Sequence, residues 1–356
     1  MNRSLTILSI FVGLMLLDWT VISHRPSALA VEVSDNNCVH AGRIISVQGQ
    51  VQLRRKDWSD YHPTAVGAQL CLGDLLLPAK GTEVVVQCAD PNQDLWTIPE
   101  GQPSGTARGC RPPKEPIHTL SKPLAPSREL LAGGIPNIIS PKKTWLLDDK
   151  PTLRWTKVPG AVSYVVRVSG PGVNWNTEVT KTEVVYPGKP PLKPGEGYLL
   201  TVWADNAETQ ARAIFGLLDG NKAVHVRAAK ERVAGQNLND KAKALAIAEV
   251  YIGQGLIAEA TELLEALVAK GTKAAAVYHM LGDLYLQVDW LRLAQSNYLQ
   301  AVDLATTAND IEGQAVAAAR LAEVEEALGN LDTATYWRTQ AQKGYKNLLT
   351  LKPITH

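Results

Sequence analysis

The sequence predicts a multidomain protein in which two small all-β domains precede an all-α helical repeat array. Between 39 and 89, β-branched residues alternate with polar ones, as in strands that bury one face. Between 139 and 219, short alternating runs are separated by Pro-Gly turns. After Asn239 the composition changes to Ala, Leu, Glu and Lys, with no proline until Pro353. This shift predicts helices in the last third of the chain.

The amino end has the features of an export signal. Arg3 supplies positive charge, Leu5 to Leu17 form an apolar run, and Ala28-Leu29-Ala30 has the small-x-small pattern of a cleavage site. We therefore expect 1–30 to be a signal peptide, with a mature chain that begins at Val31 in the periplasm or cell envelope. The apolar run is too short for a comfortable bilayer crossing, and no later stretch is long enough, so no permanent membrane insertion is expected.

The charge balance argues against two classes of partner. The chain has 36 basic and 35 acidic residues, and removal of Arg3, Arg25 and Asp18 with the signal leaves it formally neutral. Binding to nucleic acid requires a basic surface that neutralises phosphates, so no nucleic-acid partner is expected. Adsorption to anionic lipid is disfavoured for the same reason.

The four cysteines lie close together near the mature amino end. An even, clustered set in an exported protein indicates disulfides, and the absence of a C-x-x-C spacing disfavours zinc. Three pairings are possible. We favour Cys88–Cys110, because the segment between them is rich in Pro and Gly, and Cys38–Cys71 then follows by elimination.

The first β region is expected at 31–110. Its clearest alternation places Ile45, Val47, Val51 and Leu53 on one face. The segments 42–51, 65–70 and 73–76, with glycines at expected turns, resemble the FecR-type domain of bacterial envelope proteins. Seven prolines follow between 111 and 141, so 111–138 is predicted to be a semi-rigid linker.

The second β region, 139–220, resembles a fibronectin type III or immunoglobulin-like sandwich. The resemblance lies in Leu192 to Tyr198, which matches the tyrosine corner of that family, and it implies that the Tyr198 hydroxyl bonds back to the preceding turn. Tryptophans 155, 175 and 203 are interpreted as packing residues. A sugar-binding role for them is the alternative.

The helical region contains a repeat. Small residues recur at Ala248, Gly282 and Ala322, with steps of 34 and 40, and again at Ala260, Ala294 and Ala334. The pattern resembles the tetratricopeptide repeat, which implies about three helix pairs over 240–352. Small residues are expected because first and second helices cross there, so that Gly282→Leu should clash at Ala294 while Gly282→Ala should be mild. Asp289 replaces the glycine that usually ends the first helix. Residues 221–239 are expected to form a connecting or capping helix.

No catalytic, cofactor-binding or metal-binding motif appears in the sequence. The histidines are scattered, and acidic pairs such as Glu325-Glu326 have no apparent acid-base partner. We therefore expect no enzyme activity and no cofactor.

The remaining candidate is a groove along the first helices of the array. The residues expected to line it are acidic or flank the acidic ones: Glu249, Asp283, Glu323, Glu326, His279 and Leu286. Such a groove would favour protein or peptide ligands that carry Lys or Arg, although acidic residues there also suit a solvated surface. The sequence thus predicts an exported, non-enzymatic scaffold or adaptor of the bacterial cell envelope. The alternative is a cell-wall or glycan-associated module that binds through its β domains.

Overall fold

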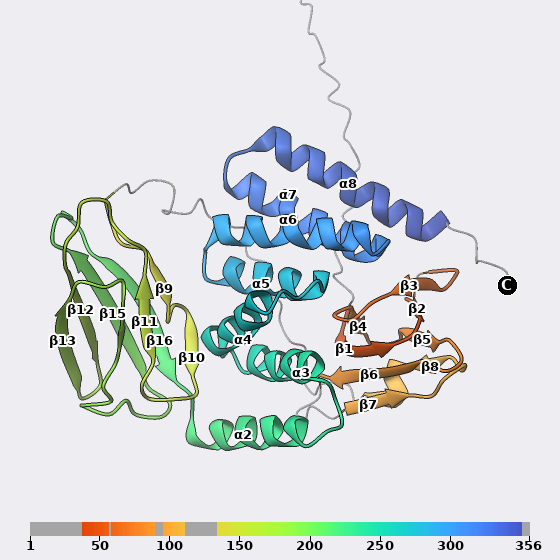
Figure 1. The fold of residues 1–356 in the computed structure, drawn as a ribbon, viewed down its shortest axis with the longest axis horizontal. Coiled ribbons are helices and arrows are strands. Elements are labelled where there is room, and N and C mark those ends of the chain that lie inside the picture. Colours follow the sequence, from red (N-terminus) through yellow and green to blue (C-terminus); the bar gives the residue numbers. More distant parts are fainter. Residues whose placement is uncertain (1–37, 57, 90–94, 111–133, 351–356) are drawn as a thin grey trace, which may run out of the picture. The chain divides into compact units, whose positions relative to one another are not determined.

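A computed structural model describes residues 38–56, 58–89, 95–110 and 134–350 (Figure 1). The expected signal peptide, and the linker up to residue 133, lie outside the described residues. Within them the predicted fold class is confirmed: β-sheet regions come first and an array of helices follows.

The N-terminal β domain consists of sheets in the orders β4-β1-β6-β7 and β3-β2-β5-β8. Their interior is apolar and includes Ile44, Leu53, Leu76 and Val86, all fully buried. The elements of this domain are β1 (His40–Gln48), β2 (Val51–Arg54), β3 (His62–Thr64), β4 (Gln69–Cys71), β5 (Leu75–Pro78), β6 (Glu83–Cys88), β7 (Leu95–Ile98), β8 (Ser104–Gly105) and the short helix α1 (Thr106–Gly109).

Disulfides close this domain at two places. Cys38 is bonded to Cys71 at the end of β4, and Cys88 at the end of β6 is bonded to Cys110. This is the pairing that the sequence favoured. Both bonds join segments at the margins of the sheets, so they hold together a domain that is too small to rely on its core alone.

The face of β1 differs from the expected one. The register between β1 and β6 shifts between Ile44 and Ser46, which is the sign of a β-bulge. As a result Ile44 and Val47 pack in the core of the domain, while Ile45 joins the apolar cluster of the helical array. The prediction that Ile45 and Val47 share a face was therefore wrong, because a single extra residue reverses the alternation.

The second β region is a sandwich of two sheets, ordered β10-β16-β15-β12-β13 and β14-β11-β9. Buried residues from both sheets, such as Leu153 and Val166, fill the space between them. The strands are β9 (Ile138–Ser140), β10 (Thr144–Leu146), β11 (Thr152–Trp155), β12 (Tyr164–Gly170), β13 (Val173–Val179), β14 (Glu183–Val185), β15 (Gly197–Ala204) and β16 (Ala211–Leu217).

Aromatic residues behave mainly as packing residues in this sandwich. The Tyr198 hydroxyl accepts a hydrogen bond from the backbone N–H of Lys193 at 2.7 Å, as the tyrosine-corner resemblance implied. Trp155 is buried against Tyr164, and Trp175 packs edge-on against Tyr186. Trp203 is half-buried on the outer face of the larger sheet.

The helices follow one another from α2 to α8 as antiparallel neighbours (Figure 1). Apart from the leading helix α2 they form pairs, each with a first and a second helix: α3–α4, α5–α6 and α7–α8. Their bounds are α2 (Gly220–Ala234), α3 (Asp240–Gly253), α4 (Ile257–Ala269), α5 (Ala275–Gln287), α6 (Leu291–Thr307), α7 (Ile311–Ala327) and α8 (Leu331–Thr350). Since α6 and α7 are each 17 residues long, against 13 for α4 and α5, the longer step in the repeat is absorbed by longer helices.

The turn after each first helix contains a residue with positive φ. Gly255 and Gly329 hold this position in the outer pairs, and Asp289 adopts φ 60° in the middle one. Aspartate tolerates the left-handed region better than most residues. The departure from glycine therefore leaves the helix–turn–helix geometry intact.

The small residue Gly282 is required for a different reason from the expected one. A Cβ built on Gly282 would lie 2.6 Å from Cδ1 of Tyr298, whose side chain is fully buried. The close neighbour on the second helix is thus Tyr298 rather than Ala294. Even an alanine at 282 would require movement of a buried ring, so the expectation that Gly282→Ala is mild conflicts with this geometry.

Candidate functional site

The residues predicted to line a groove lie on α3, α5 and α7, the first helices of the three pairs. Glu249 is on α3, while His279, Asp283 and Leu286 are on α5, and Glu323 and Glu326 are on α7. Among the described residues each of the carboxylates has a cationic neighbour within the chain. We define the first-helix face as the surface that contains Glu249 of α3, Ala276 and Asp283 of α5, and Glu312 and Glu323 of α7.

Asp283 is at the centre of a polar network. It accepts a hydrogen bond from the hydroxyl of buried Tyr298 at 2.7 Å, and it lies 3.4 Å from Nδ1 of His279 and 3.6 Å from Nε of Arg320. Burial acts to raise the pKa of Asp283, but His279, Arg320 and Tyr298 hold it below its usual value. Asp283 is therefore a carboxylate that already has partners.

His279 is packed within this network. Burial lowers the pKa of His279 below its usual value, against the opposing effect of Asp283. The ring of Tyr298 lies 5.6 Å from the His279 ring. The imidazole is thus harder to protonate than an exposed one, and it lies beside Asp283 within the network.

The predicted acids on α7 have local partners. Arg320 donates to Glu323 at 3.0 Å, which links Glu323 to the Asp283 network. Arg338 of α8 donates to Glu326 at 2.7 Å, so Glu326 contributes to the contact between α7 and α8. Leu286 is half-buried against the apolar cluster of the array. The structure therefore brings Asp283, His279 and Glu323 together and leaves Glu326 and Leu286 apart from them.

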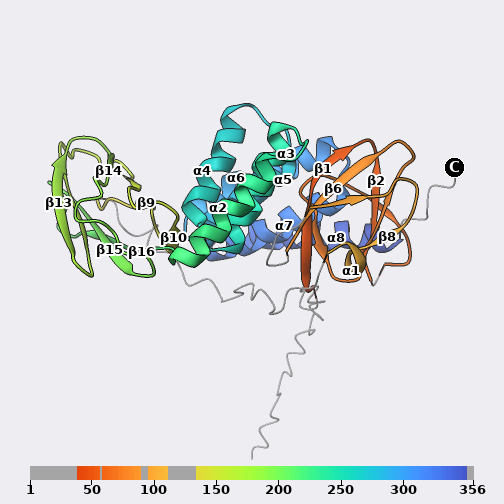
Figure 2. The same cartoon turned by 90° about the horizontal axis from the view of Figure 1, so that it is seen from below.

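Glu249 is paired with a residue from the N-terminal β domain. Its carboxylate forms an ion pair with Arg43 of β1, and both side chains are about nine-tenths buried, at 10% and 11% exposure. The β1 strand contacts α3 along this region (Figure 2). Removing one partner of a charge pair so well shielded from solvent leaves the other charge buried and uncompensated, which costs much more than breaking an exposed pair.

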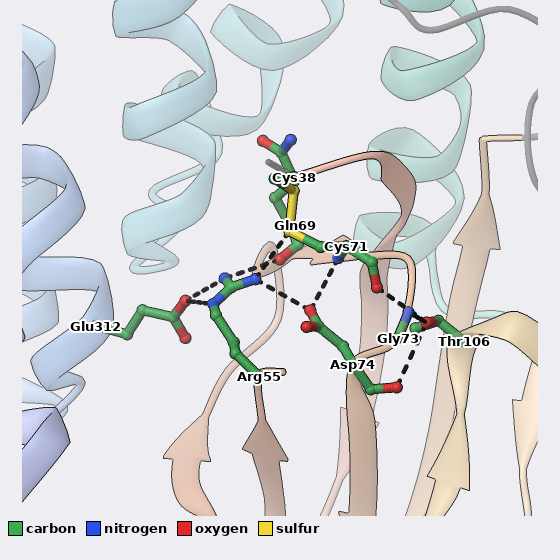
Figure 3. A network of polar contacts seen from close by, with 8 residues as sticks. All are labelled: Cys38, Arg55, Gln69, Cys71, Gly73, Asp74, Thr106 and Glu312. Carbon is green, nitrogen blue, oxygen red and sulfur yellow. Dashed lines mark hydrogen bonds and ion pairs between the residues drawn. A yellow bond between two sulfur atoms is a disulfide. The ribbon is translucent and has the colours of Figure 1, made fainter. Parts of the chain in front are cut away.

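A second arginine of the same β domain contacts α7. Nε of Arg55 donates to Glu312 at 3.0 Å, and the same guanidinium donates to Asp74 at 3.0 Å and to the carbonyl oxygen of Gln69 at 3.1 Å (Figure 3). Asp74 also accepts from the backbone N–H of Cys71 at 2.8 Å. The guanidinium is therefore fixed by its own domain in the position where it meets Glu312.

The middle helix α5 meets the β domain through a close approach. A Cβ built on Gly67 would overlap the Cβ of Ala276, so the two backbones can meet only because residue 67 is glycine. Apolar residues of the β domain, Ile45 and Val85, belong to the cluster of the helical array. The N-terminal β domain thus contacts each of the first helices.

Sequence reasoning missed Arg43, Arg55, Gly67 and Glu312. One available signal was the run Val84-Val85-Val86 in β6, which lacks the alternation of a half-exposed strand and indicates a strand covered on both faces. This signal reveals that something covers the sheet, but not which arginine meets which carboxylate.

The sandwich contacts a different part of the array. The backbone N–H of Trp145 donates to the carbonyl oxygen of Gly255 at 3.0 Å, and the indole Nε1 of Trp290 donates to the carbonyl oxygen of Ile138 at 3.1 Å. The N–H of Leu147 donates to Glu259 of α4 at 2.6 Å. Burial raises the pKa of Glu259 to about 7. These contacts lie at and beside the turns between paired helices.

The described residues contain neither of two other kinds of site. No group of three or more His, Cys, Asp or Glu there could hold a metal ion. In the part of the chain that the structure describes, no helix has both the length and the apolar composition needed to cross a bilayer.

The fold places the chain in the class of helical-hairpin repeat proteins that carry additional β domains. Solved structures that match its helical part include MamA from Desulfovibrio magneticus RS-1, with 20% identity, a TM-score of 0.30, and coverage of 36% of this chain and 68% of that one. Another MamA crystal structure is 19% identical, with a TM-score of 0.23 and coverage of 36% and 91%. BtubC (BKLC) from P. vanneervenii is 15% identical, with a TM-score of 0.20 and coverage of 38% and 78%. No family model and no curated protein matches the chain.

Proposed function

We propose that this protein is an exported, non-enzymatic interaction scaffold of the bacterial cell envelope, and that its first-helix face binds protein partners that present arginine or lysine. The observation that supports this most directly is the chemistry of the face. Glu249 and Glu312 each bind a guanidinium that comes from outside the helical array. The face is therefore suited to basic groups presented by a protein surface.

Support for export comes from the cysteines. All four are used in disulfides, and such bonds persist in oxidising compartments. The resemblance of the N-terminal β domain to FecR-type domains fits the same location. Periplasmic residence and cleavage after Ala30 would be tested by intact-mass analysis of the exported protein, where a mass that retains 1–30 would contradict the proposal.

The partner proposal would be tested by cross-linked capture from intact envelope, with the wild-type chain compared with a variant in which Glu249 and Glu323 are both changed to Gln. We expect partners that depend on the face to be depleted from the variant. An exposed acid away from the face, Glu231 on α2, provides the matched control when changed to Gln. Equal recovery from all three proteins would contradict the proposal.

A second candidate function is association with the cell wall through the sandwich. The observation that favours it is the outer face of the larger sheet, where half-buried Trp203 lies opposite Val165, which is 41% exposed. Aromatic rings of this kind can stack on sugars. Sedimentation with purified peptidoglycan would test the idea, and binding that survives Trp203→Ala would exclude this face as the glycan site.

A further inference from the structure

We infer that the N-terminal β domain is the resident ligand of the first-helix face, so that a basic partner must displace this domain in order to bind. The inference rests on the proposed function. It adds that the chain itself supplies a competitor for its own binding surface, and that the competing groups are Arg43 and Arg55.

The first argument is coverage. Arg43 pairs with Glu249 on α3, Gly67 packs against Ala276 on α5, and Arg55 pairs with Glu312 on α7. The β domain thus spans the same first helices that repeat along the array. Another protein could not reach Glu249 or Glu312 while these contacts are made, because both carboxylates are already shielded from solvent at 10% and 9% exposure.

The second argument is the chemical requirement of the face. Burial raises the pKa of Glu312, and the charge of Arg55 opposes that rise. A buried carboxylate without a cation would be strongly disfavoured. If the β domain leaves, these acids must therefore be hydrated or must take another cation. A partner that offers guanidinium groups satisfies them in the same way as the resident arginines do.

The third argument is that the β domain has its own stabilising interactions. Its interior contains fully buried residues such as Ile44 and Leu53, and disulfides close its margins. Only part of its apolar surface, represented by Ile45 and Val85, is shared with the helices. The domain can therefore leave the array as a folded unit, which is what a displaceable ligand requires.

The experiment uses the full-length exported chain and a fluorescent tetra-arginine peptide as the probe. Ala276→Gln places a longer side chain where Gly67 packs and is well tolerated by a helix. Ala266→Gln is the matched control, since Ala266 is exposed on α4. The double change of Arg43 and Arg55 to Gln opens the same contact by another route. Small-angle scattering reports undocking, circular dichroism reports folding, and fluorescence anisotropy reports binding.

We expect Ala276→Gln to undock the β domain and to bind the peptide about tenfold or more tightly than the wild type, since masking reduces apparent affinity by the open fraction. Ala266→Gln should behave as the wild type. Adding Glu249→Gln and Glu312→Gln to the undocked protein should abolish the gain, and a tetra-glutamate peptide should not bind any of the proteins.

Different failures have different meanings. Equal peptide affinity of the wild type and an undocked variant would overturn the resident-ligand inference while leaving the proposed binding face in place. An undocked variant that binds no tetra-arginine would overturn the proposed function itself. If neither Ala276→Gln nor the double arginine variant undocks a folded β domain, the domain is a fixed part of the array and the inference is wrong.

Discussion

The two β domains contact the same helical array in different ways. The sandwich meets the turns between paired helices through hydrogen bonds that include main-chain groups, as in the bond from Trp145 to Gly255, together with partly exposed charge pairs such as Lys143 with Asp289. Its last strand leads within a few residues into α2. The N-terminal β domain meets the first helices through side chains, chiefly Arg43 with Glu249 and Arg55 with Glu312. The guanidinium–carboxylate pairs of the first helices can be formed again with arginines of another protein, whereas the sandwich is also held beside α2 by a connection of only a few residues. The sandwich contact is therefore permanent, and the contact of the N-terminal β domain is exchangeable.

The largest expected effect comes from disturbing the helices that both β domains use. Gly282→Leu would force the buried Tyr298 ring to move, and this ring bonds to Asp283. Overpacking typically costs about 1–3 kcal/mol, and Leu here should lie at or above the upper end. Thermal unfolding of the full chain, followed by circular dichroism, would measure the loss, and Gly282→Ala should already be clearly destabilising.

The control for this prediction is Gly235→Ala. Gly235 is the C-cap of α2 with a right-handed backbone, and the nearest atoms to an added Cβ are carbonyl oxygens at 3.6 Å. This change should have little effect. If Gly282→Leu were as stable as the wild type, Tyr298 could not pack closely against Gly282 of α5 as described.

The next effect separates the two contacts. Arg55→Gln removes charge-assisted hydrogen bonds to Glu312 and to Asp74 of its own domain, and such bonds are worth about 1.5–3 kcal/mol each. We expect the N-terminal β domain to undock, because this allows Glu312 to be hydrated, while the sandwich stays in place. Hydrogen exchange of the Trp145 amide, bonded to Gly255, would report the sandwich contact, and scattering would report undocking.

Added salt should act in the same direction as Arg55→Gln but more weakly, since buried pairs are screened less than exposed ones. Arg54→Gln is the matched control, because Arg54 lies next in sequence and stacks over Tyr61 at 5.5 Å. Loss of Trp145 protection in the Arg55 variant would show that the two contacts are coupled, which would contradict the comparison.

A smaller effect concerns pH at the sandwich contact. Burial raises the pKa of Glu259 to about 7, although the N–H of Leu147 bonds to it, and Glu262 and Asp148 raise it further. A carboxyl group whose pKa is raised in the folded state contributes stability that is fully present at pH values below its pKa in the unfolded chain. This contribution is lost as pH rises through the folded-state pKa of about 7. Stability of the full chain should therefore fall between about pH 5 and 8, by at most about 1.4 kcal/mol per pH unit.

Glu259→Gln should flatten this dependence, since its amide oxygen still accepts the Leu147 bond without titrating. Glu262→Gln, an exposed change on the same helix, should leave most of the slope. Thermal melts at several pH values would decide the matter. A slope that persists in Glu259→Gln would show that another group controls the pH dependence.

The smallest expected effect is at Asp289. Asp289→Gly relieves a positive φ at a helix end but removes the ion pair with Lys143, in which both side chains are more than two-fifths exposed. Exposed pairs contribute about 0–1 kcal/mol, so the two terms should nearly cancel. Lys143→Gln removes the pair alone and should destabilise slightly. A large loss in Asp289→Gly would mean that this pair holds the sandwich more firmly than the main-chain bonds do.

The sequence predicted those parts of the fold that depend on local rules. The spacing of Ala248, Gly282 and Ala322 reports helix crossings, so it revealed the paired helices. Asp289 could be recognised as a turn position because the residues around it aligned with Gly255 and Gly329. In each case the constraint operates within about one repeat of the chain, and a single sequence contains it.

The candidate site was harder to predict because its determinants are far apart in sequence. Glu249 was placed on the correct helix, but its partner Arg43 lies more than 200 residues earlier. Ile45 was assigned to the wrong face, since a bulge cannot be recognised from alternation alone. The acidic residues on the first helices could thus be predicted from the sequence, whereas the arginines that pair with them could not.

The helices at the two ends of the array, α2 and α8, have outer surfaces that do not favour the packing of further helices. Along α2 the buried residues are Ala223, Val226, Ala229 and Val233, which form one stripe, and the residues between them are mainly exposed and polar. Most of α8 beyond its contact with α7 is likewise exposed. Repeat arrays grow when an apolar face is left for the next unit, and polar faces stop that growth. The mainly polar outer surfaces of α2 and α8 therefore favour an array of fixed length over the addition of further helix pairs at either end.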